Sequence, residues 1–256
     1  MIRIATGNRR PVSCAVPVER LIVIADAHIG AASPESESAL LRFLAEAPGL
    51  GDSLLVAGDL FEFWFSWRRA IPRRTFRVAS ALTALAARMP VRMVGGNHDR
   101  WGRPFWAEEA GVEWSARALD LEVAGHSVHA MHGDGVAERP GRINWSHRIV
   151  GHPLTARLFG LLHPDLGIWL VDRLAPLLGE RHITPELRAA NAARQLAHAR
   201  RLLSGPRAPW MLIMGHTHTP ALEEVAPGRF YLNPGAWLDG HRYAVVTARG
   251  AELRTF

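Results

Sequence analysis

The feature that most constrains this 256-residue chain is a repeated junction, where a short apolar run ends directly in aspartate, asparagine or histidine. The first run, RLIVIA from Arg20 to Ala25, has the continuous β-branched character of a buried strand. Aspartate and asparagine are poor strand residues, so their recurrence at strand ends needs a cause beyond local preference. The clusters that end such runs are Asp26/His28, Asp59, Asn97/His98/Asp99, His132 and His216/His218.

The segments between these junctions predict an alternation of strands and helices. Leu40, Phe43, Leu44 and Ala47 have the spacing of one helical face, and a second helix is expected near residues 72–89. This alternation favours a layered α/β sandwich with two facing mixed sheets and helices outside. We expect strands at residues 20–25, 53–57, 91–94, 119–123, 127–131, 210–214, 229–232, 242–247 and 252–256.

The pattern changes between residues 136 and 205, where the sequence is helical in character without a good strand. Thr184 followed by Pro185 is a sound helix start. We therefore predict a core made of residues 1–135 and 206–256, with residues 136–205 as an inserted helical cap. The helix after Thr184 is predicted to carry a polar stripe of Arg188, Asn191, Gln195 and His198.

The clusters at the strand ends predict a metal site. Open α/β sheets bind ligands beyond the carboxyl ends of their strands, so the clusters should converge at one edge. Carboxylate oxygens and imidazole suit divalent metals such as manganese, iron and zinc. In an extended segment, the spacing of Asp26 and His28, or of His216 and His218, would put both ligands on the same side. Two ions about 3.5–4 Å apart can clamp both oxygens of a phosphoryl displacement.

The motifs DAH, GD, GNHD, HGD and GHTH, in this order between Arg20 and Gly235, resemble the signatures of the calcineurin-like metallophosphoesterases. The resemblance implies a four-layer α-β-β-α sandwich and two divalent ions, with Mn²⁺ favoured and iron or zinc as alternatives. It implies catalytic roles for His98, which would stabilise charge or protonate the leaving group, and for Asp99, which would orient His98. The implied ligands are Asp26, His28 and His218 for one ion, Asn97, His132 and His216 for the other, and Asp59 as a bridge.

A closer resemblance is to the UDP-2,3-diacylglucosamine pyrophosphohydrolase family. It rests on GDLFEFW (Gly58 to Trp64), GHTHTP (Gly215 to Pro220), the helical insertion and GAW (Gly235 to Trp237). That family cleaves a nucleotide-linked glycolipid to UMP and lipid X at the membrane surface. His98 stands where that family commonly has arginine, and Ser66 to Arg69 replace an acidic cluster. These departures keep open a soluble phosphodiester, a dinucleotide or a phosphoprotein as substrate.

Composition narrows the partners further. The net charge is +6 and every basic residue is arginine, whose fork matches phosphate oxygens. The basic residues form no aromatic-interleaved run, so no nucleic-acid partner is expected.

The single cysteine, Cys14, excludes an intramolecular disulfide. No signal peptide is visible, and charges and prolines break the apolar stretch from Leu154 to Leu178. We expect a cytoplasmic enzyme, peripheral on the inner membrane if its substrate is a lipid; the oligomeric state stays open.

Some remaining residues admit two interpretations. The tryptophans near the clusters would either stack on a nucleobase or pack beneath the sheet edge. Four arginines near them would either bind phosphate or lie exposed. These residues are Trp64, Trp67, Trp101 and Trp106, and Arg100, Arg103, Arg139 and Arg142.

Overall fold

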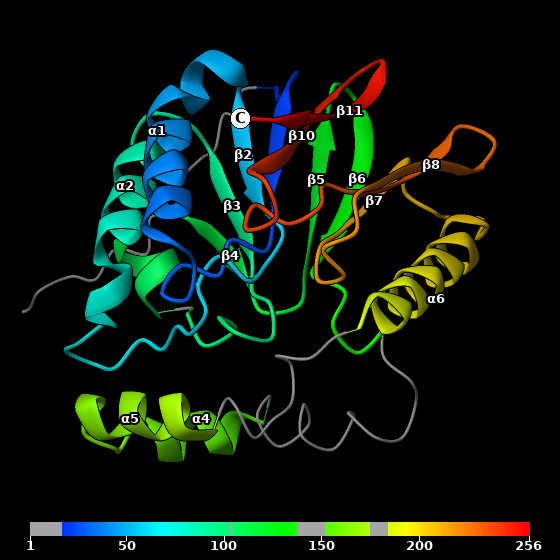
Figure 1. The fold of residues 1–256 in the computed structure, drawn as a ribbon. Helices are drawn as coiled ribbons and strands as arrows, with labels where there is room; N and C mark the ends of the chain where they lie inside the picture. The colour runs from blue at the N-terminus through cyan, green and yellow to red at the C-terminus, as the bar shows by residue number, and fades with distance from the viewer. Residues whose placement is uncertain (1–16, 103, 138–151, 175–183) are drawn as a thin grey trace, which may run out of the picture.

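The fold is described from a computed structural model, for residues 17–102, 104–137, 152–174 and 184–256. Cys14, Arg103, Arg139 and Arg142 lie outside these ranges. The described chain forms two mixed β-sheets with helices outside them (Figure 1). The predicted α/β sandwich with two mixed sheets is confirmed.

The first sheet holds the earliest strands of the chain and the last two. Its strand order is β11-β10-β1-β2-β3-β4. Strands β1 to β4 are parallel to one another, whereas β10 is antiparallel to both of its neighbours, β1 and β11. The strands are β1 (Leu21–Ile24), β2 (Ser53–Val56), β3 (Val91–Val94), β4 (Glu113–Ser115), β10 (Arg242–Thr247) and β11 (Gly250–Thr255).

The second sheet is built from the middle of the chain. Its order is β5-β6-β7-β9-β8, and β6, β7 and β9 are parallel to one another. The outer strands β5 and β8 are antiparallel to their neighbours. The strands are β5 (Ala118–Val123), β6 (His126–Met131), β7 (Met211–Met214), β8 (Ala221–Ala226) and β9 (Arg229–Asn233).

Alternating residues of the strands belong to two different hydrophobic cores, because successive side chains of a strand point to opposite faces. Leu21 and Val23 of β1 pack between the sheets, together with Val128 of β6 and Ile213 of β7. Ile22 and Ile24 instead join the core beneath the outer helices. Because β1 is buried on both faces, it reads as a continuous apolar run rather than an alternating one.

Helices α1 (Pro34–Leu50) and α2 (Phe76–Ala86) cover the first sheet. Helix α1 begins where the Ser33 hydroxyl accepts a hydrogen bond from the Ser36 amide at 3.2 Å, with Pro34 in the first turn. A 3₁₀ turn, η1 (Arg73–Thr75), leads into α2, and a π-helical turn, η2 (Pro104–Glu109), follows β3.

Helix α6 (Pro185–Leu203) covers the second sheet, although it falls within the range predicted as a cap. It begins as predicted, with the Thr184 hydroxyl accepting from the Leu187 amide at 3.3 Å. Its buried residues Ala199 and Leu203 pack with Leu212 of β7 and Tyr231 of β9. Gln195, a member of the predicted polar stripe, is fully buried. The helix is therefore the fourth layer of the sandwich.

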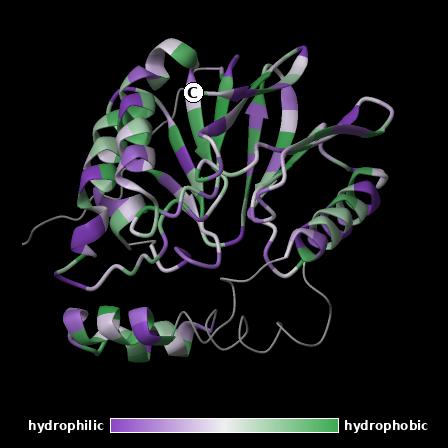
Figure 2. Cartoon of the chain, in the orientation of Figure 1, coloured by the Kyte–Doolittle hydropathy of each residue, from purple (hydrophilic) through white to green (hydrophobic). Residues whose placement is uncertain are grey.

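Helices α4 (Pro153–Phe159) and α5 (Pro164–Leu174) lie apart from these layers, below the loop that follows β2 in the view of Figure 1. Phe159 of α4 contacts the rings of Phe63, Phe65 and Trp67 at centroid distances of 5.9, 5.0 and 5.7 Å. Figure 2 shows apolar and polar residues mixed along both helices. The exposed apolar residues here are Leu154, Leu158, Leu161, Leu166, Trp169 and Leu174.

The sequence did not predict β4 and β8. Strand β4 has three residues and carries Glu113 and Trp114, and β8 carries two adjacent glutamates, so neither presents a clear apolar run. Both lie at sheet edges, where pairing with a neighbour decides the structure. None of the helices in the described ranges is long and apolar enough to span a membrane.

Candidate metal centre

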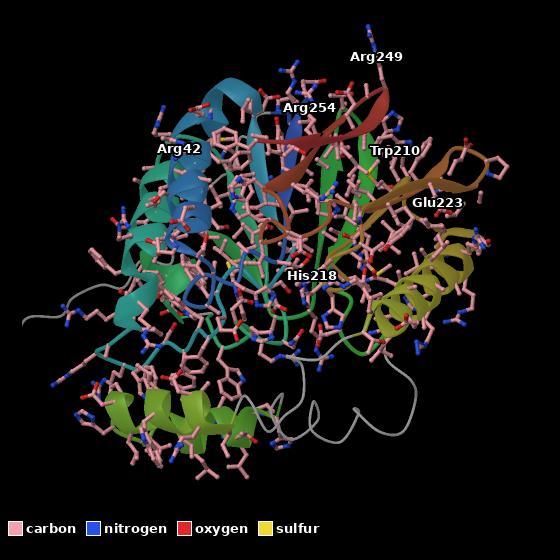
Figure 3. All side chains as sticks on the ribbon, in the orientation of Figure 1. Arg42, Trp210, His218, Glu223, Arg249 and Arg254 are labelled. Carbon is pink, nitrogen blue, oxygen red and sulfur yellow. The ribbon has the colours of Figure 1, made fainter. Side chains whose placement is uncertain are left out.

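The predicted polar clusters meet at one edge of the sandwich, the edge at which Figure 3 labels His218, because the strands before them are parallel within each sheet. Backbone hydrogen bonds join the loops there. The Asp26 amide donates to the Gly58 carbonyl at 3.0 Å, and the His28 amide donates to the Asp59 carbonyl at 3.1 Å. Within the second sheet, the Gly215 amide donates to the His132 carbonyl at 3.0 Å. Between the sheets, the His216 amide donates to the Asp26 carboxylate oxygens at 3.0 and 3.1 Å. The site therefore spans both sheets.

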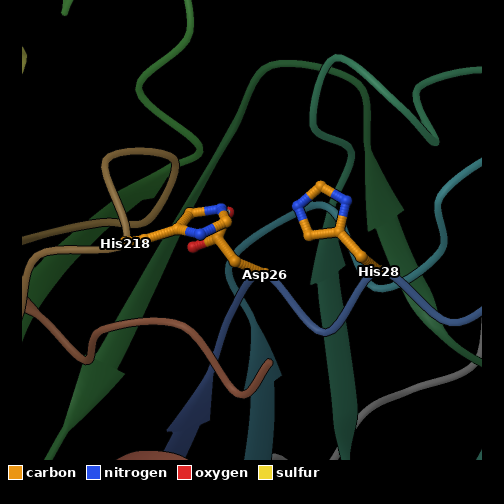
Figure 4. A group of neighbouring side chains, drawn as sticks. All are labelled: Asp26, His28 and His218. Atoms are coloured by element: carbon orange, nitrogen blue, oxygen red, sulfur yellow. The ribbon is translucent and has the colours of Figure 1, made fainter. Parts of the chain in front are cut away.

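The first group of side chains is Asp26, His28 and His218, whose potential ligand atoms lie within 4.8 Å of one another. The imidazole of His218 lies beside the carboxylate of Asp26, and His28 faces both from the opposite side (Figure 4). His218 Nε2 is 3.6 Å from Asp26 Oδ1. These residues come from the loops after β1 and β7, as the resemblance implied.

The second group is Asp59, His132 and His216, again with ligand atoms within 4.8 Å. His132 Nε2 is 3.0 Å from Asp59 Oδ2, and the rings of His132 and His216 are 5.0 Å apart. Asn97 belongs to the adjoining loop after β3, where the next amide, that of His98, donates to Asp59 Oδ1 at 2.9 Å. The structure thus brings all seven predicted ligands to the loops of one sheet edge.

Asp59 connects the two groups. Its Oδ2 atom is 3.0 Å from His132 Nε2 and 4.0 Å from His28 Nε2. Burial disfavours charge on Asp59 and on His132, but their mutual attraction outweighs it. The pKa of Asp59 is therefore held well below its ordinary value, and the pKa of His132 is raised well above its own. The two side chains, with Asp59 Oδ2 3.0 Å from His132 Nε2, are therefore strongly coupled in their electrostatics.

The backbone at the site is strained. Asp26, His28, Asp59, His216 and His218 all have positive φ angles, between 47° and 69°. For residues other than glycine this left-handed conformation costs roughly 1–3 kcal/mol each, and such strain gathers at functional sites. An extended backbone was expected to put His216 and His218 on the same side of the chain, and this expectation was wrong. In the left-handed conformation, His218 joins the group of Asp26 and His216 joins the group of Asp59.

Two glycines make room for the ligands. A side chain at Gly96 would begin 2.1 Å from Asp59 Oδ1, and one at Gly58 would begin 2.2 Å from His132 Nδ1. Gly58 also has a φ of +94°, which other residues rarely adopt. Both glycines belong to the predicted motifs, and their role is to let side chains approach the backbone closely.

His98 lies half-buried at the same place, with its ring 4.8 Å from that of His28. Its Nδ1 atom is 2.8 Å from the Glu62 carbonyl. Asp99 is fully buried, and its carboxylate accepts hydrogen bonds from the amides of Gly96, Leu60 and Phe61. Burial, with the charge of Asp59 adding to it, raises the pKa of Asp99 to about 6. These bonds fasten the loops of Asp59 and His98 together.

Sequence analysis missed two carboxylates beside the site. Glu62 Oε2 is 2.9 Å from His28 Nδ1. Asp239 Oδ2 is 3.5 Å from His218 Nδ1 and 3.1 Å from Arg188 Nη1 of α6. Glu62 lies inside the GDLFEFW run, three residues after Asp59, so the motif itself was the available signal. Asp239 follows β9, another parallel strand with its carboxyl end at this edge.

A buried polar network supports the loop of His216 and His218. Gln195 of α6 donates to the Gly215 carbonyl at 3.0 Å and accepts from the Thr217 hydroxyl at 3.0 Å and the Tyr231 hydroxyl at 2.9 Å. Asn233 donates to the same carbonyl at 3.0 Å. Helix α6 therefore supports the loop that carries His216 and His218, through the hydrogen bonds of Gln195.

The tryptophans and the GAW segment are mainly structural. Trp64 and Trp106 are fully buried with ring centroids 4.6 Å apart, so for these two residues the packing interpretation holds rather than stacking on a nucleobase. Trp67 and Trp101 contact Phe159. In GAW, the Trp237 amide donates to the Ala25 carbonyl at 2.9 Å and so holds the first metal loop. Arg100, considered as a phosphate ligand, forms an ion pair with Asp134.

The residues present suit divalent ions. The donor set is carboxylate and imidazole with an amide nearby, as hard to borderline metals require. His28 Nε2 is buried and makes no hydrogen bond among the described residues. Such an atom is costly to bury unless something coordinates it.

Comparison with known proteins identifies the family. The model of the calcineurin-like phosphoesterases matches residues 19–220, which include every residue of the two groups. The chain belongs to this family. It is therefore a metal-dependent phosphoesterase, with the His/Asp groups above as its candidate metal sites.

Among curated proteins, this phosphoesterase is similar to UDP-2,3-diacylglucosamine hydrolase of Salmonella arizonae and to the protein of the same name from Salmonella gallinarum. Each is 28% identical over 249 residues, which covers 92% of this chain and 98% of the relative. Among solved structures, vacuolar protein sorting 29 of Cryptosporidium parvum matches with a TM-score of 0.46 and 15% identity, over 93% of this chain and 92% of that one. The family assignment rests on the family model.

Proposed function

We propose that this phosphoesterase cleaves the phosphoanhydride of UDP-2,3-diacylglucosamine, or of a related nucleotide-linked lipid, to give UMP and a product like lipid X. The observation that carries the proposal is the helical segment α4–α5, which exposes several leucines and Trp169 and is attached to the loop that leads away from Asp59 and Glu62. The name of the curated relatives agrees with this substrate. The phosphates of this substrate suit the candidate metal groups, and its acyl chains suit the exposed apolar residues of α4 and α5.

In this proposal, Asp26, His28 and His218 hold one ion, and Asn97, His132 and His216 hold the other, with Asp59 between them. Two divalent ions in these positions would supply positive charge against the phosphoryl oxygens and would lower the pKa of a bound water. The preferred ion is Mn²⁺, because the ligands are oxygen and imidazole without thiolate; iron and zinc are the alternatives.

The remaining residues act on position and charge. His98 lies beside His28 and stabilises charge on the phosphoryl oxygens or protonates the leaving group. Asp99 acts as a positioning residue, because it binds the amides that follow Asp59 and the Gly96 amide that precedes His98. Glu62 holds the His98 ring through its backbone carbonyl.

The helices α4 and α5 are proposed as the part of residues 136–205 that serves as a cap. Their exposed leucines and Trp169 offer apolar area, and each buried CH₂ contributes about 0.8 kcal/mol, so a long acyl chain gains substantially from such a surface. This cap also gives the protein a means of peripheral contact with a membrane. The cytoplasmic face of the inner membrane is the proposed location.

A comparative assay tests the function. Metal-depleted protein is supplied with Mn²⁺ and offered UDP-2,3-diacylglucosamine, UDP-N-acetylglucosamine and bis-p-nitrophenyl phosphate. We expect UMP release from the acylated substrate and little reaction with the other two. Fast hydrolysis of the simple diester, with no reaction of the lipid, would instead support a soluble phosphodiester, dinucleotide or phosphoprotein substrate, which His98 in place of arginine favours.

A further inference from the structure

Three histidines of the site, His28, His132 and His218, present the same nitrogen to the site interior. A histidine that binds a metal through one nitrogen is fixed in tautomer and orientation by the partner of its other nitrogen. His28, His132 and His218 each have their Nδ1 atom within 3.5 Å of an oxygen outside the two groups. Their Nε2 atoms face Asp59, Asp59 and Asp26, respectively. Their Nδ1 partners therefore set which atom is available for a metal.

These Nδ1 partners differ in charge. His132 is held by a neutral backbone carbonyl, that of Ala57, at 2.9 Å. His28 and His218 are held by carboxylates, Glu62 at 2.9 Å and Asp239 at 3.5 Å. Both carboxylates therefore act on the same group, the one that contains Asp26. A carboxylate in this position also raises the basicity of the ligand nitrogen, which strengthens its bond to a metal.

Glu62 is itself held firmly. Its backbone amide donates to the Ile29 carbonyl at 3.0 Å, so the residue is tied to the segment that follows His28. Its side chain is 30% exposed, which leaves the carboxylate partly screened but in direct contact with the imidazole. Its carbonyl is 2.8 Å from His98 Nδ1, whereas its side-chain Oε2 is 3.8 Å from that atom and only 2.9 Å from His28 Nδ1. A change of the Glu62 side chain therefore acts mainly on His28.

Asp239 is held from the opposite side of the site. It lies in the loop after β9, where its amide donates to the Ala236 carbonyl at 3.3 Å. Arg188 of α6 donates to the same carboxylate oxygen that faces His218, at 3.1 Å. The guanidinium holds the Asp239 carboxylate in place and stabilises its negative charge. Helix α6 is in this way connected to the first group.

We propose that Glu62 and Asp239 are positioning residues that fix His28 and His218 with Nε2 toward the ion beside Asp26, and that they set the affinity of that one ion. The proposal rests on the two-ion site of the proposed function. In comparable sites, loss of such a partner weakens metal binding by about 10- to 100-fold. The ion beside His132, which is held through Ala57, keeps its affinity.

Calorimetric titration of metal-depleted protein with Mn²⁺ tests the proposal. The wild-type protein is expected to bind two ions. Glu62→Gln and Asp239→Asn are each expected to weaken one ion by about 10- to 100-fold and to leave the other unchanged. Glu62→Ala should weaken that ion more than Glu62→Gln, because the amide of glutamine can still accept the hydrogen bond from His28.

Asp120→Asn is the matched control. Asp120 Oδ1 is 2.7 Å from His129 Nδ1, the same kind of pair, on β5 and β6 outside the two groups. This variant should titrate like the wild type. The thermal unfolding of metal-free Glu62→Gln should also match that of Asp120→Asn, because the proposed effect needs the metal.

Three results would overturn the proposal: Glu62→Gln and Asp239→Asn curves that superimpose on the wild type, equal weakening of both ions, or destabilised metal-free variants. These results differ from a failure of the two-ion site, in which the wild-type protein would bind fewer than two ions. They also differ from a failure of the proposed substrate, which would leave the titration of the wild-type protein at two ions.

Discussion

The loops of the metal edge and the helices α4–α5 are held in opposite ways. The loops contain fully buried carboxylates, left-handed backbone and hydrogen bonds between elements of both sheets. The helices bury little except Gly167 and join the body through Phe159, the Gly167 contact with Trp67 and an exposed Arg74–Asp172 ion pair. The candidate metal ligands therefore lie in the part of the molecule that is most tightly held, whereas substitutions in the helices proposed to select the substrate should not unfold the body.

Removal of Asp59 should have the largest effect. Because Asp59 contacts both groups, Asp59→Ala should lose bound metal and lower kcat/KM by more than about 10⁴-fold, since the ions supply several kcal/mol of transition-state stabilisation. Elemental analysis of purified protein and a Mn²⁺-dependent assay measure both quantities. Full activity in EDTA-stripped wild-type protein would contradict this account of the metal edge.

His98→Ala should separate catalysis from metal binding. We expect kcat to fall by about 10²–10⁴-fold, the usual contribution of a proton-transfer group, while the metal content stays at the wild-type value. The comparison with Asp59→Ala is the control, because both variants alter the same cluster of loops. Equal metal loss in the two variants would mean that His98 is a ligand rather than a catalytic residue.

Phe159→Ala should affect only the selection of substrate. Loss of its contacts with Phe63, Phe65 and Trp101 releases α4, and we expect KM for the acylated substrate to rise by about 10-fold, or about 1.4 kcal/mol. Metal content and the unfolding of the body should not change. Leu161→Ala, at a leucine that is 82% exposed, is the control. A matching loss of activity toward a simple diester would place α4 within the chemistry instead.

Gln195→Ala should change activity least and stability most clearly. The variant leaves the Gly215 carbonyl and the hydroxyls of Thr217 and Tyr231 buried with fewer partners, at a cost of about 1–3 kcal/mol. Urea unfolding of metal-free protein measures it, with Arg194→Ala on the same helix as the control. A difference below about 0.5 kcal/mol, typical of a surface substitution, would show that the network is dispensable.

The parts of the site that the sequence predicts are the residues that directly follow predicted strands. The seven proposed ligands and His98 each follow an apolar run, and the topology of parallel strands brings such positions together. The left-handed backbone of Asp26 and His216 could not be predicted, since neither is a residue that favours this conformation strongly enough. It arises from hydrogen bonds between loops that are far apart in sequence.

The supporting residues escaped prediction for a related reason. Asp239 and Gln195 look like ordinary polar residues, one in a loop and one on a helix that reads as amphipathic. Their roles come from contacts with residues 20 or more positions away, Asp239 with His218 and Gln195 with Gly215. The position of α6 was likewise decided by packing against β7 and β9, which no local pattern reports.

One consequence of the sheet order concerns synthesis of the protein. Strand β1 lies between β2 and β10, and Trp237 and Leu238 donate to the backbone carbonyls of Ala25 and Asp26. While the ribosome is still making residues before 242, the first strand therefore has one open edge and the loop of Asp26 lacks its clamp. Such long-range pairing folds slowly, and an open apolar edge invites aggregation. The nascent chain should thus depend on chaperones until its last strands emerge, and the metal edge should mature only afterwards.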